Sequence, residues 1–100
     1  MKLWPKKLVT VITEKALEEI LIRELKEIGV KGYTVTDARG EGSRGVRNAY
    51  WEMGANIRVE IVTDDLVAQK ICEVFQEKYY TNYAMIIYVS DVLTLRGGKF

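Results

Sequence analysis

Histidine is absent from this chain of 100 residues, and cysteine and proline occur once each. Without histidine, the serine–histidine and cysteine–histidine arrangements of nucleophilic catalysis are excluded, as are the usual zinc ligand sets. The single cysteine, Cys72, cannot form a disulfide within the chain, and its place in a helical pattern indicates packing rather than chemistry. We therefore expect no catalytic residue and no metal held directly by side chains.

Long apolar runs and a large excess of one charge are also missing. No apolar run approaches the roughly 20 residues that cross a membrane, and the N-terminal segment up to Val9 does not have the apolar stretch of a secretory signal. The chain has 15 basic and 14 acidic residues, a net charge of +1, so binding to long nucleic acids through bulk electrostatics is not expected. The composition predicts a single domain over residues 1–100, located in the cytoplasm.

Apolar periodicity predicts four strands and two helices. Thr13 is expected to cap the first helix, which ends at Gly29, and Thr63 or Asp64 to cap the second. The predicted strands cover residues 8–13, 33–36, 57–61 and 84–89, and the helices fill the intervals 14–28 and 65–78. This β-α-β-β-α-β order predicts an α+β, ferredoxin-like fold: a four-stranded antiparallel sheet with two helices on one face.

The sheet is expected to be apolar on both faces, although two helices can cover only one of them. The first strand places Leu8 and Ile12 on one side and Val9 and Val11 on the other. The uncovered face is therefore expected to pack on another copy of the chain. The alternative, that the N- and C-terminal tails cover this face, stays open.

A long loop between the second and third strands, at about residues 39–54, contains the stretch GEGSRGVR. Its glycines allow the main chain to turn toward a ligand, and Arg44 and Arg47 supply the planar, charged donors that suit a phosphate or carboxylate. Backbone amides in such a turn form a concave anion-binding surface. The loop therefore predicts an anion site. In the competing interpretation it is a solvated loop whose arginines pair with Asp37 and Glu41.

Three known patterns resemble parts of this loop or fold but do not fit the sequence. The letters GEGSRG match a dinucleotide fingerprint, but that motif must open a full helix, and the segment after Gly45 is short and closed by Gly54. Acylphosphatases hold phosphate between the first strand and the first helix, which is another place. An RNA-binding sheet would need exposed aromatic residues at the positions of Arg58 and Glu60.

Two stretches resemble the PII signalling superfamily. These are Gly32-Tyr-Thr-Val-Thr-Asp-Ala-Arg-Gly-Glu-Gly42 and the return strand Ile57-Arg-Val-Glu-Ile-Val62. Within the superfamily, Gly40-Glu-Gly-Ser-Arg-Gly-Val-Arg47 is most similar to the GxGSRxVR loop of the SbtB-type, carbon-sensing PII-like proteins. The end, Leu93-Thr-Leu-Arg-Gly-Gly-Lys-Phe100, also resembles some of their C-terminal tails, here at about residues 91–100.

The resemblance implies a homotrimer that binds an adenine nucleotide (AMP, ADP, ATP or cAMP) in clefts between subunits. It places Thr34, Val62 and Glu60 around the adenine. It assigns the phosphates to the loop and the neighbouring tail, through Gly40, Gly42, Ser43, Arg44, Arg47 and Arg96. It further implies Mg or Ca bound through the nucleotide, and bicarbonate as a second ligand. The segment Lys78-Tyr-Tyr-Thr-Asn-Tyr-Ala84 departs from the family, because nitrogen-sensing members have a glycine-rich phosphate loop there.

The distal part of the loop carries Tyr50, Trp51 and Met53, a set of side chains suited to burial against a partner. The resemblance implies that this partner is a membrane transporter for bicarbonate or another small anion, contacted peripherally at the inner face of the membrane. In the alternative, Trp51 folds back on its own trimer. Two other functions were weighed: slow hydrolysis of nucleotide phosphates with Glu41 or Glu60 activating water, and a purely structural trimer like that of CutA proteins.

Overall fold

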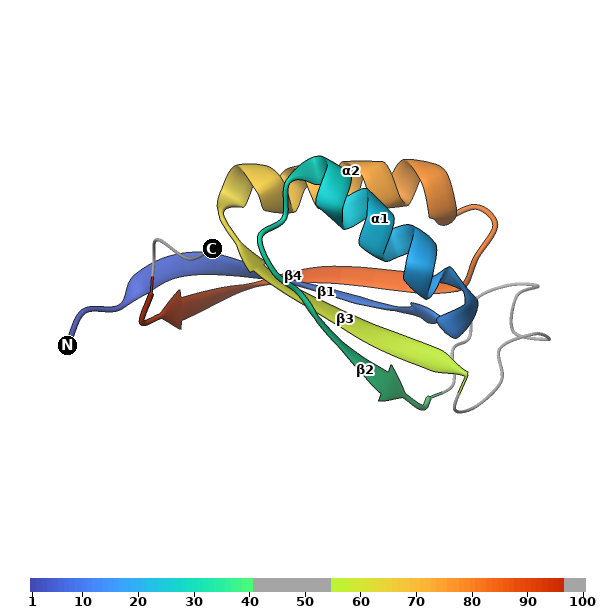
Figure 1. The fold of residues 1–100 in the computed structure, drawn as a ribbon, viewed down its shortest axis with the longest axis horizontal. Helices are drawn as coiled ribbons and strands as arrows, with labels where there is room; N and C mark the ends of the chain where they lie inside the picture. The colour runs from blue at the N-terminus through green and yellow to red at the C-terminus, as the bar shows by residue number, and fades with distance from the viewer. Residues whose placement is uncertain (41–54, 97–100) are drawn as a thin grey trace.

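Four strands and two helices alternate along the chain in the predicted order. The structure, a computed structural model, describes residues 1–40 and 55–96. Its elements are β1 (Trp4–Glu14), a short 3-10 helix η1 (Lys15–Leu17), α1 (Glu18–Ile28), β2 (Thr34–Ala38), β3 (Asn56–Thr63), α2 (Asp65–Tyr79) and β4 (Met85–Thr94). This order and the arrangement in Figure 1 confirm the ferredoxin-like fold.

The four strands form one antiparallel sheet in the order β2-β3-β1-β4. The central strand β1 pairs with both β3 and β4, so that Val9 lies between Ile61 on one side and Val89 on the other. Both helices cover the same face of the sheet (Figure 1). The predicted arrangement of two helices on one face is therefore confirmed.

The core lies between the helices and the covered face of the sheet. Val9 and Val11 of β1 are fully buried there, together with Leu21 and Leu25 of α1 and Phe75 of α2. Burying an apolar side chain of this size contributes roughly 1.5–3 kcal/mol. The spacing of these residues, two along the strand and four along the helices, is the pattern that predicted the elements.

The opposite face of the sheet, here called the open face, carries no helix. Strand alternation places Leu8, Thr10 and Ile12 of β1 on this face, and Ile86 and Tyr88 of β4 beside them in register. Ile86 is 52% exposed and Tyr88 41% exposed. The open face therefore presents apolar surface at its β4 side.

Strands β1 and β4 are longer than the sequence predicted. Their pairing extends beyond the end of β3 to the pair formed by Trp4 and Thr94, whereas β1 and β3 pair only as far as Lys7 and Thr63. Residues 4–6 and 92–94 form a two-stranded projection, here called the arm (Figure 1). The predicted start at residue 8 and end at residue 89 were thus too short, because cross-strand pairing continues the ladder. Residues 91–94, assigned to the tail, belong to β4.

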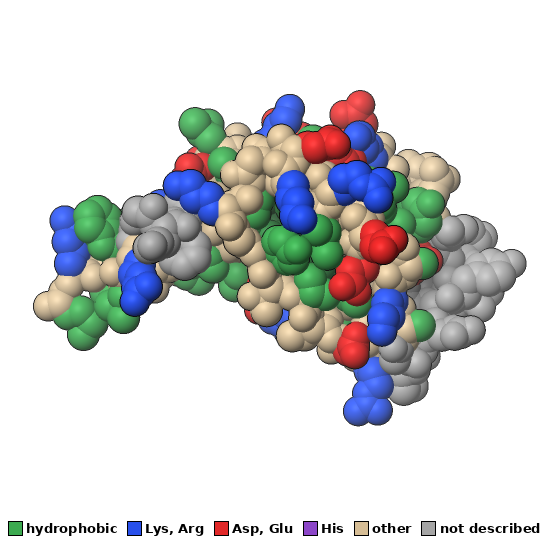
Figure 2. Space-filling model, in the orientation of Figure 1, with side chains coloured by type: hydrophobic (Ala, Val, Ile, Leu, Met, Phe, Trp, Pro, Cys, Tyr) green, Lys and Arg blue, Asp and Glu red, His purple; other side chains and the backbone are tan. Residues whose placement is uncertain are grey.

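The arm exposes apolar side chains next to basic ones (Figure 2). Leu93 in the arm and Leu95 just beyond it are each 63% exposed, and the ammonium of Lys2, just before the arm, lies 4.2 Å from the centre of the Trp4 ring. A two-stranded ribbon is marginally stable on its own in water. Because the ribbon is weak alone and exposes Leu93, we expect it to pack against another chain.

The helix ends follow the predicted signals at two of three positions. Asp64 caps α2 by accepting a 2.9 Å hydrogen bond from the Val67 N–H. Gly29 ends α1 in the left-handed conformation, with φ at 102°. The predicted cap at Thr13 was wrong, because Thr13 is still in β1 and its hydroxyl donates to the Ala84 carbonyl at 2.7 Å.

A polar cluster joins the two helices on their outer side. The Glu24 carboxylate, which is buried, accepts a hydrogen bond from the Tyr79 hydroxyl at 3.0 Å and lies 2.7 Å from the Lys78 Nζ. The hydrogen bond from Lys78 holds the pKa of Glu24 below its usual value, with a smaller contribution from Tyr79. Burial, together with the hydrogen bond to Glu24, raises the pKa of Tyr79 to about 12.

This cluster predicts a pH-dependent part of the protein's stability. Because folding lowers the pKa of Glu24, its contribution is present above the unfolded-state pKa and is lost as the pH falls through the lower, folded-state value. At about pH 7, Glu24→Gln is expected to lower the free energy of unfolding by about 1 kcal/mol, and at a pH below the unfolded-state pKa of the carboxyl this loss should be smaller. Urea unfolding at both pH values measures this. An equal loss at both values would contradict it.

Candidate functional site

The long loop leaves and rejoins the sheet at the end where β1 finishes. Ala38 at the end of β2, Asn56 at the start of β3 and Glu14 at the end of β1 lie in one row across the sheet. The Lys15 N–H donates a 2.9 Å hydrogen bond to the Ala55 carbonyl, which fixes the point where the loop rejoins β3. We call this edge of the sheet the loop end.

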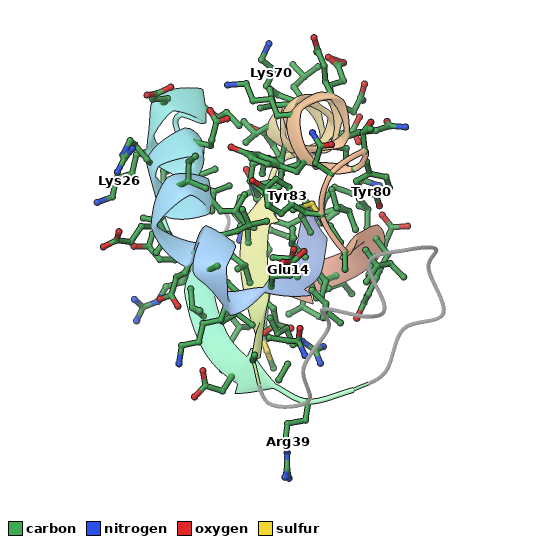
Figure 3. All side chains as sticks on the ribbon, turned by 90° about the vertical axis from the view of Figure 1, so that its right-hand side faces the viewer. Glu14, Lys26, Arg39, Lys70, Tyr80 and Tyr83 are labelled. Atoms are coloured by element: carbon green, nitrogen blue, oxygen red, sulfur yellow. The ribbon has the colours of Figure 1, made fainter. Side chains whose placement is uncertain are left out.

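The turn between α2 and β4 (residues 80–84) lies at the same loop end. Its last residue is held at two points, because the Ala84 N–H donates to the Glu14 carboxylate at 2.8 Å while its carbonyl accepts from the Thr13 hydroxyl. The Tyr80 hydroxyl in turn accepts the Ile87 N–H of β4 at 3.0 Å. Figure 3 shows Glu14 and Tyr83 close together at this end of the molecule. The turn is thus tied to the end of β1.

The three residues assigned to the adenine lie together on the open face. Thr34 of β2 is the register partner of Glu60 of β3, and Val62 follows two positions along β3 on the same face. Thr34 is exposed, while the other two are partly buried. The Glu60 carboxylate lies 3.4 Å from the Arg58 guanidinium, which fixes its position on the face.

The first residue assigned to the phosphates lies at the other end of β2. Gly40 comes two positions after the last residue of this strand, Ala38, whereas Thr34 is its first residue. Six residues of extended chain span up to about 20 Å. One chain therefore presents two separate sets of predicted site residues, at opposite ends of β2.

Arg96 is far from Gly40 and also from the adenine set of its own chain. Tyr88 is the β4 residue in the row of Thr34 and Glu60, and Arg96 lies eight positions beyond it. Arg96 is exposed and follows β4 by two residues, next to the arm. The arm projects from the end of the sheet opposite to the loop end (Figure 1). Arg96 and Gly40 of the same chain are thus far apart.

The remaining predicted residues lie outside the described part of the chain. For the phosphates these are Gly42, Ser43, Arg44 and Arg47, and for the partner surface they are Tyr50, Trp51 and Met53. The Asp37 carboxylate, a candidate partner for the loop arginines, lies 3.5 Å from the Lys15 Nζ. Both of these side chains are exposed, so the pair contributes little to stability.

Sequence reasoning missed Glu14 and its bond to the turn. A Thr-Glu pair after an apolar strand was interpreted as the start of a helix, which is the commoner meaning of such residues at that place. The partner, Ala84, lies 70 residues further along the chain. No local pattern signals a hydrogen bond of that separation.

Two further properties bear on ligands and membranes. Residues 1–40 and 55–96 contain no group of three or more acidic or cysteine side chains placed to hold a metal ion. Within the same ranges, neither helix combines the length and the apolar character that spanning a bilayer requires.

Comparisons with known proteins agree with this fold. The family model "Nitrogen regulatory protein P-II" matches residues 6–99. The chain is 28% identical to the nitrogen regulatory protein P-II of Azospirillum brasilense over 108 aligned positions, covering 94% of each. It is 49% identical to a PII-like signalling protein from Thermus thermophilus, with a TM-score of 0.84 over 100% of this chain and 99% of that one.

A second similar structure contains bound ligands. It is CPII, a nitrogen regulatory PII-like protein from Thiomonas intermedia, bound to ADP, AMP and bicarbonate. The two chains are 29% identical, with a TM-score of 0.79, over 93% of this chain and 96% of that one. Each of these three alignments covers nearly the full length of both proteins compared.

Proposed function

Because this chain belongs to the P-II family of signalling proteins, we propose that it is a PII-like sensor of adenine nucleotides. It binds AMP, ADP, ATP or cAMP in clefts between the subunits of a homotrimer. The nucleotide-bound state is passed on through the loop at residues 39–54. Support for the ligand class comes from CPII, which has been solved with ADP, AMP and bicarbonate.

The observation that carries the proposal is the separation of the two sets of residues along β2. Thr34 and Glu60 lie at one end of the strand and Gly40 at the other, up to about 20 Å apart. A nucleotide that contacts both sets is most simply held between two chains. One chain then offers its adenine set, with Val62, and its neighbour offers its loop end. Arg96, which is far from Gly40 of its own chain, is assigned to phosphates bound at the loop end of a neighbouring chain.

The phosphate contacts are assigned to the loop. Arg44 and Arg47 are three residues apart in the sequence, close enough in a tight turn to bracket one phosphate group. Each charge-assisted hydrogen bond supplies about 1.5–3 kcal/mol. Two or three of them, together with stacking of the base, give micromolar affinity. The remaining donors are the hydroxyl of Ser43 and the amides of Gly40 and Gly42.

The trimer is assigned to the open face. Ile86 and Tyr88 expose apolar surface on it, and a symmetric assembly removes that surface from water. The arm adds exposed leucines at the edge of the same sheet. The family assignment and this surface point to the same oligomer.

The output of the sensor is assigned to the distal loop. Tyr50, Trp51 and Met53 form its contact with a membrane transporter, which carries bicarbonate or another form of inorganic carbon. The contact is peripheral, at the cytoplasmic face of the membrane. Bicarbonate is the second ligand in this proposal. Mg or Ca binds only through the nucleotide. The protein acts as a sensor and does not hydrolyse the nucleotide.

A thermal-shift panel tests the proposed ligand class. AMP, ADP, ATP and cAMP, each with and without bicarbonate, are expected to raise the melting temperature of the trimer, since a ligand that binds only the folded state stabilises it by mass action. GMP and CMP serve as controls for the base. If no adenine nucleotide shifts the melting temperature, or if GMP shifts it equally, the proposal fails.

A further inference from the structure

The hydroxyl of Thr10 is buried and has no hydrogen-bond partner in residues 1–40 and 55–96. Thr10 lies near the middle of β1 on the open face, and it is 0% exposed even in the single chain. The other threonine of this strand, Thr13, donates its hydroxyl hydrogen to the Ala84 carbonyl. A buried hydroxyl without a partner costs free energy and is rare in folded proteins. The Thr10 hydroxyl therefore points to a partner that it gains in another state of the protein.

Two side chains flank Thr10 in its row of the open face. These are Glu60 of β3 and Tyr88 of β4, its register partners on either side. Facing side chains on neighbouring strands have Cβ atoms about 4.5–5.5 Å apart, close enough to contact. The Tyr88 hydroxyl lies at the tip of a rigid ring that stands up from the sheet, well above the short side chain of Thr10. Glu60 has a flexible side chain that ends in an acceptor carboxylate, so it is the neighbour suited to accept from Thr10.

The Glu60 carboxylate has a different partner in the single chain. It lies 3.4 Å from the guanidinium of Arg58, two positions along β3 on the same face. The Glu60 and Arg58 side chains are 35% and 44% exposed, and an ion pair so open to water contributes little to stability. A charge-assisted bond from the buried Thr10 hydroxyl lies in a drier place, where such bonds are stronger. Exchanging Arg58 for Thr10 therefore needs little free energy.

We infer that Thr10 is a positioning residue of the nucleotide site, and that its hydroxyl donates a hydrogen bond to the Glu60 carboxylate when a nucleotide is bound. The inference rests on the proposed function, because Glu60 belongs to the adenine set. A nucleoside that lies on this set takes water away from the carboxylate, which then needs other donors. Thr10 supplies one of them from within the sheet. The other carboxylate oxygen is then held in place to accept from an N–H or O–H group of the nucleoside.

The experiment measures AMP affinity by calorimetry and the stability of the nucleotide-free protein by urea unfolding. Thr10→Val keeps the shape of the side chain and removes the hydroxyl, whereas Thr10→Ser keeps the hydroxyl. Thr36→Val removes an exposed hydroxyl from β2 on the same face and is the matched control. Glu60→Ala, alone and combined with Thr10→Val, shows whether Thr10 acts through Glu60.

Thr10→Val is expected to weaken AMP binding about fivefold. The nucleotide-free variant should be as stable as the wild type or more stable, because an unpaired buried hydroxyl has been replaced by a methyl group. Thr10→Ser and Thr36→Val should each stay within about twofold of the wild-type affinity. In the Glu60→Ala background, adding Thr10→Val should cause no further loss of affinity.

Three results would overturn the inference and leave the sensor proposal standing. The first is an unchanged AMP affinity in Thr10→Val. The second is a less stable nucleotide-free Thr10→Val protein, which would show that the hydroxyl already has a partner. The third is an undiminished loss of affinity from Thr10→Val in the Glu60→Ala background. A wild-type protein that does not bind AMP would overturn both the inference and the sensor proposal.

Discussion

Replacing Ile86 with glutamate is expected to dissociate the trimer and to lower the affinity for adenine nucleotides by at least about tenfold. Ile86 lies on the open face, opposite the helices, with Ile12 as its register partner. Its side chain is 52% exposed in the single chain, so a carboxylate there is solvated in the monomer. In the trimer the same carboxylate would be buried without a partner, which costs several kcal/mol. The proposed site should be lost with the trimer, because each proposed cleft takes residues from two chains.

Leu66→Glu is the matched control for this experiment. Leu66 is 78% exposed on α2, which covers the other face of the sheet. The same change in charge there should leave both the trimer and the nucleotide affinity intact. Light scattering after gel filtration measures the oligomer, and calorimetry with AMP measures the affinity. A trimeric Ile86→Glu protein with wild-type affinity would contradict the assignment of the open face.

Arg44→Ala is expected to weaken binding of adenine nucleotides tenfold or more, a loss of about 1.4 kcal/mol or greater. The reason is the loss of a charge-assisted hydrogen bond from the guanidinium to a phosphate. The effect should be present for AMP, ADP and ATP and absent for adenosine, which has no phosphate. Calorimetry with each ligand separates the phosphate contribution from the contribution of the base.

The control for Arg44 is a nearby arginine outside the assigned set. Arg39 is exposed and follows the end of β2, and Figure 3 shows its side chain pointing away from Glu14 and Tyr80. Arg39→Ala removes the same charge at the base of the same loop, and it should change the affinity less than about twofold. If Arg39→Ala costs as much as Arg44→Ala, the loop acts through its total charge. If Arg44→Ala costs nothing, its assignment to the phosphates is wrong.

The elements of the fold could be predicted because their apolar periodicity is strong. Val9 and Val11 on β1 and Leu21 and Leu25 on α1 repeat at the spacing of a strand and of a helix. The lengths of β1 and β4 could not be predicted in the same way. The arm has no regular apolar alternation, with Pro5 opposite Leu93, and it is held by the backbone ladder between distant parts of the chain.

The strand positions of Thr34, Glu60 and Val62 could be predicted from the sequence, whereas their separation from Gly40 could not. Glu60 lies opposite Thr34 because β2 pairs with β3, the next strand along the chain. The strand pattern of these two segments was therefore enough to predict that the two residues are neighbours. Their separation from Gly40 depends on the direction in which β2 runs and on where the long loop leaves it. The bond between Glu14 and Ala84 depends on two segments 70 residues apart. Such contacts are set by packing of the whole domain.

One titration tests the central claim most directly. AMP added to the wild-type protein in a calorimeter is expected to bind with a micromolar dissociation constant and to saturate at one nucleotide for each chain, which is three for each trimer. This stoichiometry follows from equivalent clefts, each built by two neighbouring chains. The absence of saturable binding would contradict the account.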